Sequence, residues 1–297
     1  MEKVGNAKVP AQWFAPVTID QMEAVESIRL ASGNTLYTYT FPTLFAWQAD
    51  EQYRICLLDD AFLVKNGSRG ENAYLFPCGT QEGKKKLIDR LLLEESPTFY
   101  FISDADKDFL EAAYPHRFLF TTCRDDYPYL YDKEAQISLK GKTYKRLRHP
   151  INLGRHAAQT WSMEALHADN IDRALAINQK WGLERSTDDL ADTLAVETAL
   201  RHFSRLGMWG LLFQADGIDT AFIAGSFVTP QIFDVNFCKV LKKQCDCYIK
   251  WALCQALPAE VTTLDSEEDM GLAGLRRHKM LRVPNRLTRV WKGSLQA

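Results

Sequence analysis

Long apolar runs are missing from this sequence. The longest unbroken ones, such as MWGLLF and AFIAG, fall far short of the roughly 18 residues that a membrane span requires. The opening residues, MEKVGNAKVPAQWF, also lack the apolar core of a secretory signal. We therefore expect a cytoplasmic protein without a transmembrane segment.

An excess of charge of either sign is also missing. The chain has 36 Lys and Arg against 38 Asp and Glu, for a formal net charge of -2. The whole molecule is therefore not a strongly basic nucleic-acid binder, and any attraction for an anionic partner must be local.

Cysteine is too sparse and too scattered for a disulfide framework, since there are seven in 297 residues. Cys238, Cys245, Cys247 and Cys254 follow a C-x6-C-x-C-x6-C pattern, whereas zinc sites usually contain pairs spaced C-x2-4-C. The segment around them has helical periodicity. We therefore predict that these cysteines are core residues, and we predict no metal site.

The length and the order of the elements indicate two similar halves, 1–138 and 139–297. Periodicity in the first half predicts helices over 18–32, 80–95 and 104–115 and strands over 53–60, 61–67, 73–79, 97–103 and 116–123. In the second half, the pattern predicts helices over 167–184 and 194–207, which end at Gly182 and Gly207. Three strands within 209–240 and a cysteine-bearing helix follow. The last elements are a strand over 260–266, a helix through 264–280 and a strand over 286–293. Asp104 or Asp106 is expected to cap its helix. No close sequence repeat joins the halves, but the shared order is typical of two acyltransferase units of the GNAT fold, an α/β class with mostly antiparallel sheets.

Two stretches contain no acid at all. Residues 139–156 hold six Lys or Arg and two His, His149 and His156, and residues 270–297 hold seven Lys or Arg. Each stretch alone is compatible with a solvated face. If the two stretches meet in space, a phosphate-bearing ligand becomes the natural partner, because guanidinium groups fit phosphate oxygens.

The stretch SEEDMGLAGLRRHKM, residues 266–280, places three acids before two glycines and three bases. Acids in a first helical turn and bases in a last one would complement the helix dipole. Gly271 and Gly274 are not explained in that way, because each costs about 1 kcal/mol inside a helix relative to alanine. The alternative is that this backbone permits a close approach at a binding site.

This stretch resembles the signature near the C-terminus of the phosphatidylglycerol lysyltransferase C-terminal-domain family. LKGKTYKRLRHPIN, RDDYPYLYD and YTFPTLFAW resemble further segments of that family in the expected order. The resemblance implies two tandem GNAT-like halves. It also implies transfer of an aminoacyl group from charged tRNA to a lipid or to another amine or hydroxyl acceptor, without a further cofactor.

The resemblance carries over residue by residue. Glu267, Glu268, Asp269, Arg276 and Lys279 match the signature; Lys145, Arg148 and Asn152 match the basic segment; and Lys239 matches a lysine on the strand before the cysteine-bearing helix. It implies Asp269 or Glu267 as general base, or as partner of the aminoacyl ammonium, and the other residues as substrate contacts, with phosphates on the bases.

The chain also departs from the family pattern, at Asp265, Ser266, Leu281, Arg282, Cys238, His149 and Pro150. Two alternatives therefore stay open. One is an acetyl-CoA-dependent N-acyltransferase, although LKKQCDCY contains no glycine where such enzymes usually hold the pyrophosphate. The other is a GNAT-like protein that binds tRNA, a nucleotide or a protein without catalysis.

Overall fold

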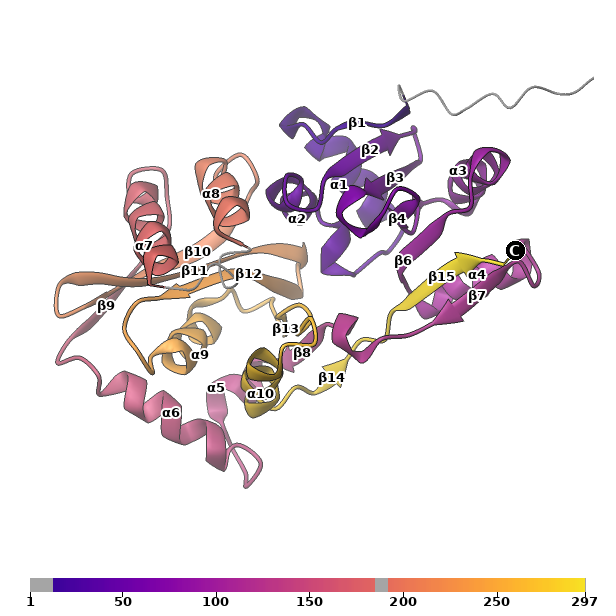
Figure 1. The fold of residues 1–297 in the computed structure, drawn as a ribbon. Helices are drawn as coiled ribbons and strands as arrows, with labels where there is room; N and C mark the ends of the chain where they lie inside the picture. Colours follow the sequence, from indigo (N-terminus) through magenta and orange to yellow (C-terminus); the bar gives the residue numbers. More distant parts are fainter. Residues whose placement is uncertain (1–12, 185–191, 297) are drawn as a thin grey trace, which may run out of the picture. The chain divides into compact units, whose positions relative to one another are not determined.

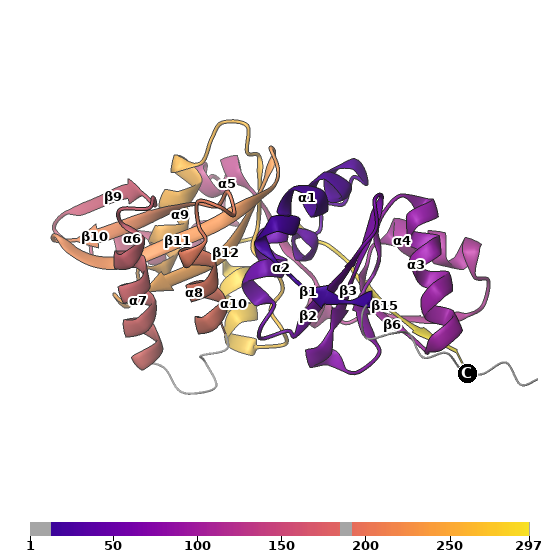
Figure 2. The ribbon, with the colours of Figure 1, turned by 90° about the horizontal axis from the view of Figure 1, so that it is seen from above.

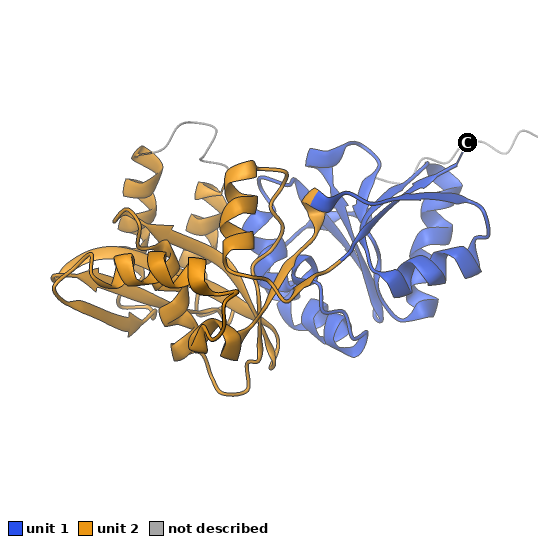
Figure 3. Ribbon diagram, turned by 90° about the horizontal axis from the view of Figure 1, so that it is seen from below, with its two compact units in different colours: residues 1–124, 289–297 blue, residues 125–288 orange. Residues whose placement is uncertain are grey.

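The computed structural model describes residues 13–184 and 192–296, which form two compact units. Unit 1 comprises residues 1–124 and 289–297, and unit 2 comprises residues 125–288 (Figure 3). Both units are mixed α/β structures with a mostly antiparallel sheet. Among the described residues, no helix combines the length and apolar character needed to cross a bilayer.

The sheet of unit 1 is built from short strands that are nearly all antiparallel (Figure 1). Their order is β1 (Ala15–Pro16), β2 (Tyr53–Leu57), β3 (Ala61–Asn66), β4 (Ala73–Leu75), β6 (Thr98–Ile102), β15 (Trp291–Leu295) and β7 (Phe118–Thr121), with β5 (Cys78–Gly79) paired to β3. The meander expected over 53–79 is confirmed. The pair β4–β6 is parallel.

Helices cover both sides of this sheet. They are α1 (Met22–Ala31), α2 (Phe41–Trp47), α3 (Gln81–Glu94) and α4 (Asp104–Ala113). Figure 2 shows α1 and α2 on one side of the strands and α3 and α4 on the other. Consecutive residues of β3 are therefore buried on opposite faces, and Leu63 packs with Leu87 and Leu91 of α3. The N-cap of α4 is Ser103, and not Asp104 or Asp106, because the Ser103 hydroxyl accepts the Asp106 amide.

The sheet of unit 2 has the order β14 (Arg286–Leu287), β8 (Tyr129–Asp132), β13 (Thr263–Asp265), β12 (Ile232–Val240), β11 (Ile218–Thr229), β10 (Trp209–Ala215) and β9 (Trp161–Ala165). Its helices are α5 (Lys133–Ser138), α6 (Lys145–Arg155), α7 (Ile171–Leu183), α8 (Thr193–Arg201), α9 (Asp246–Ala256) and α10 (Ala273–Leu281). In Figure 1, α7 and α8 lie on one face of the sheet, and α9 and α6 lie on the other. The ends expected at Gly182 and Gly207 are wrong by one and six residues, since α7 continues to Leu183 and α8 stops at Arg201.

Each sheet contains, in the corresponding place, a strand that is distant in sequence from the two strands that flank it. In unit 1, the C-terminal strand β15 lies between β6 and β7; in unit 2, β8 lies between β13 and β14. In each sheet, a parallel pair of strands lies next to this strand: β4–β6 in unit 1 and β12–β13 in unit 2. The compact units thus differ from the halves 1–138 and 139–297, because a cut at 138 separates β8 from its own sheet.

The parallel step of unit 2 is short. Ile232, Phe233 and Asp234 pair with Thr263, Leu264 and Asp265, after which β13 ends while β12 continues to Val240. Apolar residues of β12 and β13, including Phe233 and Leu264, belong to the core cluster that α9 covers. Asp234 and Asp265 therefore lie opposite one another at the point where the parallel pairing stops.

Candidate functional site

The acids of the signature lie in an irregular loop and not in a helix. The helix expected through 264–280 begins only at Ala273, so its first turn contains no acid and the helix-dipole interpretation is wrong. Glu267, Met270 and Gly271 adopt positive φ, which bends the chain sharply after β13. At Gly271, an added Cβ would lie 2.7 Å from an Asp125 carboxylate oxygen, so the close approach is real there. At Gly274 no described atom lies within 4 Å of such a Cβ.

Asp269 accepts the central hydrogen bonds of this loop. Its buried carboxylate accepts hydrogen bonds from the Tyr129 hydroxyl at 2.5 Å, from the Gly271 amide at 3.0 Å, and from Arg276 Nε and Nη2 at 2.9 and 2.7 Å. Arg276 also donates to Asp125 at 2.5 Å. These donors occupy both oxygens of Asp269, so the contacts favour a role in holding the loop over the predicted role of general base.

Lys279 also faces the protein rather than an open surface. Its buried ammonium donates to the carbonyls of Ser266 and, at 2.6 Å, of Glu268. It lies 5.6 Å from the centre of the Tyr129 ring. Burial lowers the pKa of Lys279, and the acid Glu267 opposes that change. These contacts make Lys279 a clamp on the backbone of the loop, whereas the resemblance implied a phosphate contact.

A cluster of acids lies where strands β12 and β13 meet the loop, and it comprises Asp234, Asp265 and Glu267. Asp234 and Asp265 are both almost inaccessible, and Asp265 accepts the Glu267 amide at 2.9 Å. Asn236 donates to Asp234 Oδ2 at 2.5 Å and accepts from the Ser226 hydroxyl at 3.0 Å. Within the described part of the chain, the buried oxygens Asp234 Oδ1 and Glu267 Oε1 have no hydrogen-bond partner.

This environment disfavours negative charge. Burial raises the pKa of Asp234 and of Glu267 well above their ordinary range, and the neighbouring acids raise both further. Burial also raises the pKa of Asp265 to about 7. Carboxylates of this kind ionise readily only when a cation joins them, so the cluster has the chemistry of a cation site.

The remaining predicted residues lie elsewhere in unit 2. Lys239 is buried, with its ammonium 2.6 Å from both oxygens of Asp192 and 3.5 Å from the centre of the Trp181 ring. Arg148 donates to the carbonyls of Leu139 and Gly141 at 2.6 and 3.0 Å. The other residues of the basic segment, Lys145 and Asn152, are exposed on α6, as is His149, and His156 is exposed just after the helix.

The two acid-free stretches meet through an apolar contact. Leu281, from the second stretch, packs against the cluster that contains Leu139, Leu147 and Ile151 from the first. Arg282 is also buried, with its guanidinium 4.4 Å from the centre of the Tyr131 ring. The structure thus gathers Glu267, Glu268, Asp269, Arg276 and Lys279 around one loop, while the α6 residues stay on a separate helix.

Five residues of the site were not among the predicted ones: Asp125, Tyr129, Asp234, Asn236 and Asp265. Asp234 and Asn236 are polar residues at a spacing of two in the otherwise apolar segment IFDVNF, which is an unusual pattern for a buried strand. This pattern is the feature of the sequence that could have identified Asp234 and Asn236 as site residues. Asp125 and Tyr129 came from the aromatic segment RDDYPYLYD, whose partners only the fold reveals.

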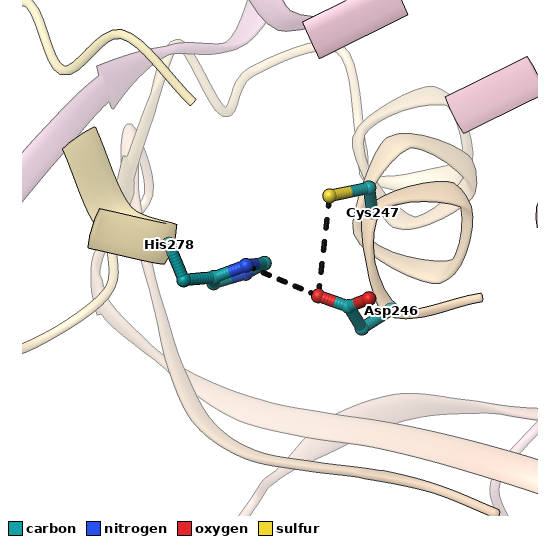
Figure 4. A group of neighbouring side chains, drawn as sticks. All are labelled: Asp246, Cys247 and His278. Carbon is teal, nitrogen blue, oxygen red and sulfur yellow. Dashed lines mark hydrogen bonds and ion pairs between the residues drawn. The ribbon is translucent and has the colours of Figure 1, made fainter. Parts of the chain in front are cut away.

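A second group of polar side chains lies at the start of α9 (Figure 4). His278 Nδ1 is 3.2 Å from Asp246 Oδ2, and Cys247 Sγ is 3.9 Å from the same oxygen. Lys250 Nζ is 2.9 Å from His278 Nε2. The Lys250 ammonium, aided by burial, lowers the pKa of His278 to about 3, so its imidazole is neutral. Cys245, Cys247 and Cys254 are buried, as the core interpretation predicts.

The two sheets define a tandem GNAT-like fold, because each has a parallel pair of strands next to a strand that is distant from it in sequence. A model of the phosphatidylglycerol lysyltransferase C-terminal family matches residues 32–289, and the chain belongs to that family. No curated protein sequence matches this chain. The resemblance expected from the signature is thereby confirmed.

Solved structures show the same fold. A conserved protein of unknown function from Bacteroides thetaiotaomicron VPI-5482 has a TM-score of 0.85 and 22% identity over 95% of this chain and 99% of that one. The C-terminal domain of a putative lysylphosphatidylglycerol synthetase from Agrobacterium fabrum has a TM-score of 0.67 and 13% identity, with 94% and 92% covered. L-PGS from Bacillus licheniformis has a TM-score of 0.64 and 11% identity, with 99% and 94% covered. These likenesses show that the chain shares the fold of these proteins along nearly its whole length.

Proposed function

We propose that this protein transfers an aminoacyl group from aminoacyl-tRNA to a lipid or to another amine or hydroxyl acceptor. The observation that carries the proposal is the buried acidic cluster, in which Asp234 Oδ1 and Glu267 Oε1 have no partner among the described residues. Membership of the phosphatidylglycerol lysyltransferase C-terminal family supports the same class of reaction.

An ammonium group fits this cluster. Two buried carboxylate oxygens without donors lose the hydrogen bonds that water would provide, which costs free energy until a cation supplies them. The amino group of an aminoacyl ester carries both the positive charge and the donors. Asp234 would bind it through Oδ1, and Asp265 would add charge from the facing strand. An acetyl group has no such amine, so the cluster favours an aminoacyl donor over acetyl-CoA.

The transfer itself needs few groups. The acceptor nitrogen or oxygen attacks the ester carbonyl, a new amide or ester bond forms, and the bond to the terminal ribose oxygen of the tRNA breaks. The acceptor releases a proton and the ribose oxygen gains one. Of the two predicted catalytic acids, Glu267 retains an oxygen without a donor, whereas Asp269 is bound on both oxygens. Glu267 is therefore our candidate for the proton transfer.

The tRNA would contact α6. This helix exposes Lys145, Arg146 and Arg155 and buries Leu147 and Ile151 against its neighbours. Exposed bases on one helix are suited to contact a phosphate backbone. Replacing Lys145 and Arg146 by alanine should weaken tRNA binding and lower its salt dependence by about one unit of slope for each contact.

The test compares donors with and without a free amine. Radiolabelled lysyl-tRNA and alanyl-tRNA, and their N-acetylated forms, are incubated with vesicles of phosphatidylglycerol or with an amino sugar, and labelled acceptor is counted. Transfer should require the free amine. Asp234→Asn and Glu267→Gln should each lower transfer by about a hundredfold, a typical cost for losing one electrostatic group. Binding of uncharged tRNA should not change.

Asp169→Asn is the matched control, because the Asp169 side chain in the same unit is 96% exposed. Circular dichroism confirms that each variant is folded. The proposal is wrong if N-acetylated donors react equally well, if both acidic variants keep full transfer, or if the protein acetylates the acceptor from acetyl-CoA instead. Binding of tRNA without any transfer would favour a binding protein.

A further inference from the structure

The start of α9 and the middle of α10 bring together an imidazole, a thiol and a carboxylate. Asp246 and Cys247 are the first two residues of α9, and His278 is the sixth residue of α10. One ligand atom from each lies within 4.8 Å of the other two (Figure 4). Among the described residues, this is the group of His, Cys, Asp and Glu side chains whose geometry could hold a metal ion.

We propose that Asp246, Cys247 and His278 bind a zinc ion. A tetrahedral zinc ion holds nitrogen, oxygen and sulfur ligands at about 2.0–2.3 Å, which places neighbouring ligand atoms about 3.3–3.8 Å apart. The Nδ1–Oδ2 and Sγ–Oδ2 distances of 3.2 and 3.9 Å already approach these values. Small side-chain rotations therefore complete three corners of the tetrahedron.

The ligand types select the metal. Thiolate and imidazole favour zinc, whereas magnesium and calcium require oxygen ligands. The Asp246 side chain is 41% exposed, so an ion from solution has access and a water molecule can take the fourth position. Three protein ligands with one open position are typical of zinc sites that bind an exchangeable ligand.

Lys250 competes with the metal. Its ammonium donates to His278 Nε2 at 2.9 Å, which leaves the imidazole proton on Nδ1, facing Asp246. Zinc binding at Nδ1 moves that proton to Nε2, so Lys250 stops donating there, and the Cys247 thiol releases one proton on forming the thiolate. A nearby ammonium also repels a divalent cation. Removing the charge of Lys250 should therefore strengthen zinc binding.

The consequence for the protein is a link between two helices. Zinc would join the start of α9 to α10, which carries Arg276 and Lys279, two residues that bind the loop beside the acidic cluster. The ion would stabilise that loop from outside. This inference does not depend on which reaction, if any, the acidic cluster performs.

The test uses the full chain, stripped of metal with a chelator and titrated with cobalt(II), whose thiolate complexes give a charge-transfer absorption. We expect one cobalt per chain, displacement by zinc, and a higher melting temperature with zinc. Cys247→Ser and His278→Ala should each weaken binding by more than about 100-fold, since changes around a ligand alone cost 10–100-fold. Lys250→Met should tighten it by about tenfold or more.

Cys123→Ser is the control, because Cys123 is exposed and lies in unit 1, so it should bind cobalt as the wild type does. Asp246→Asn offers a second, milder variant if Cys247→Ser fails to fold. The proposal is overturned if the thiolate band is absent from the wild type. It is also overturned if the band persists in Cys247→Ser, or if Lys250→Met leaves the affinity unchanged.

Discussion

Tyr129 and Tyr131 show at the scale of single residues how the loop is held. Both are buried on β8 and both donate a hydrogen bond from the hydroxyl, but the acceptors differ. Tyr129 donates to the Asp269 carboxylate, and Tyr131 donates to the Lys279 carbonyl at 2.9 Å. Hydrogen bonds to charged groups contribute more to stability than bonds to neutral ones.

Tyr129→Phe should therefore lower the free energy of unfolding by about 1.5–3 kcal/mol, and Tyr131→Phe by about 0.5–1.5 kcal/mol. Urea denaturation of the two variants beside the wild type measures both losses. Because the two substitutions remove the same atom from neighbouring positions, each serves as control for the other. Equal losses would show that the hydrogen bond to the Asp269 carboxylate is no stronger than the one to the Lys279 carbonyl.

The acidic cluster should leave a signature in the pH dependence of stability. Burial raises the pKa of Asp265 to about 7, against an ordinary value of about 3.9. Between these values the folded state keeps a proton that the unfolded state has released, so stability is lost as pH rises from about 4 to about 7. The slope reaches about 1.4 kcal/mol per pH unit for one such group.

Asp265→Asn removes this carboxyl group, so the variant lacks the contribution of Asp265 to the slope of unfolding free energy against pH. Between pH 5 and pH 8, the wild type should lose about 2–3 kcal/mol more unfolding free energy than the variant does. Urea denaturation at both pH values measures the difference. Subtracting the unfolding free energy of the variant from that of the wild type removes the contributions of other acids. One of these is Asp219, whose pKa the hydrogen bond from Arg173 lowers. Parallel pH curves would mean that Asp265 is ionised throughout.

At the scale of elements, two glycines that look equivalent in sequence have different environments, because Gly271 lies in the loop between β13 and α10 and Gly274 lies in α10. Gly271 has a φ of +74° and faces Asp125, whereas Gly274 lies within the first turn of α10, where no described atom crowds it. Only Gly271 therefore needs to be glycine. Gly274 costs helix stability without a contact that requires it.

Gly271→Ala should destabilise the protein by about 1–2 kcal/mol, because alanine is disfavoured at positive φ, and the clash with Asp125 adds to that cost. Gly274→Ala should stabilise it by up to about 1 kcal/mol. Thermal and urea unfolding of the matched pair decide the point. If Gly274→Ala is destabilising or blocks function while the fold is intact, the exposed backbone at Gly274 contacts a ligand.

At the scale of the whole molecule, one strand in each sheet pairs with strands that are distant from it in sequence, and this pairing determines which segments form one unit. β8 lies in the middle of the β14–β8–β13 ladder of unit 2, although it precedes the second predicted half in sequence. Removing it would leave β13 and β14 without the strand that joins them. The fold thus depends on pairing between residues more than 100 positions apart.

Two fragments test this arrangement. Residues 125–288 contain every strand of the unit 2 sheet, and should unfold in one cooperative transition followed by circular dichroism. Residues 139–297 lack β8 and carry β15 without its partners, and should aggregate or show no transition. Cooperative folding of the second fragment, or failure of the first, would contradict the role assigned to β8.

Local sequence patterns determined much of this protein. The periods of apolar residues predicted most helices and strands, and the acid–glycine–base stretch with its companion segments indicated the family and the tandem GNAT-like class. These features depend on neighbours in the chain, so they are readable in one dimension. The same reasoning made the signature acids part of a helix, because charge at helix ends is a common cause of such spacing.

Only the tertiary structure decided what the charged residues do. Asp234 and Asp265 come from different strands and share one face only because β12 and β13 run parallel for three residues. Asp269 and Lys279 hold the loop because Tyr129, Arg276 and two carbonyls converge on them from separate elements. Burial and contact between distant residues determine whether a charge is paired, and those are properties of the folded chain.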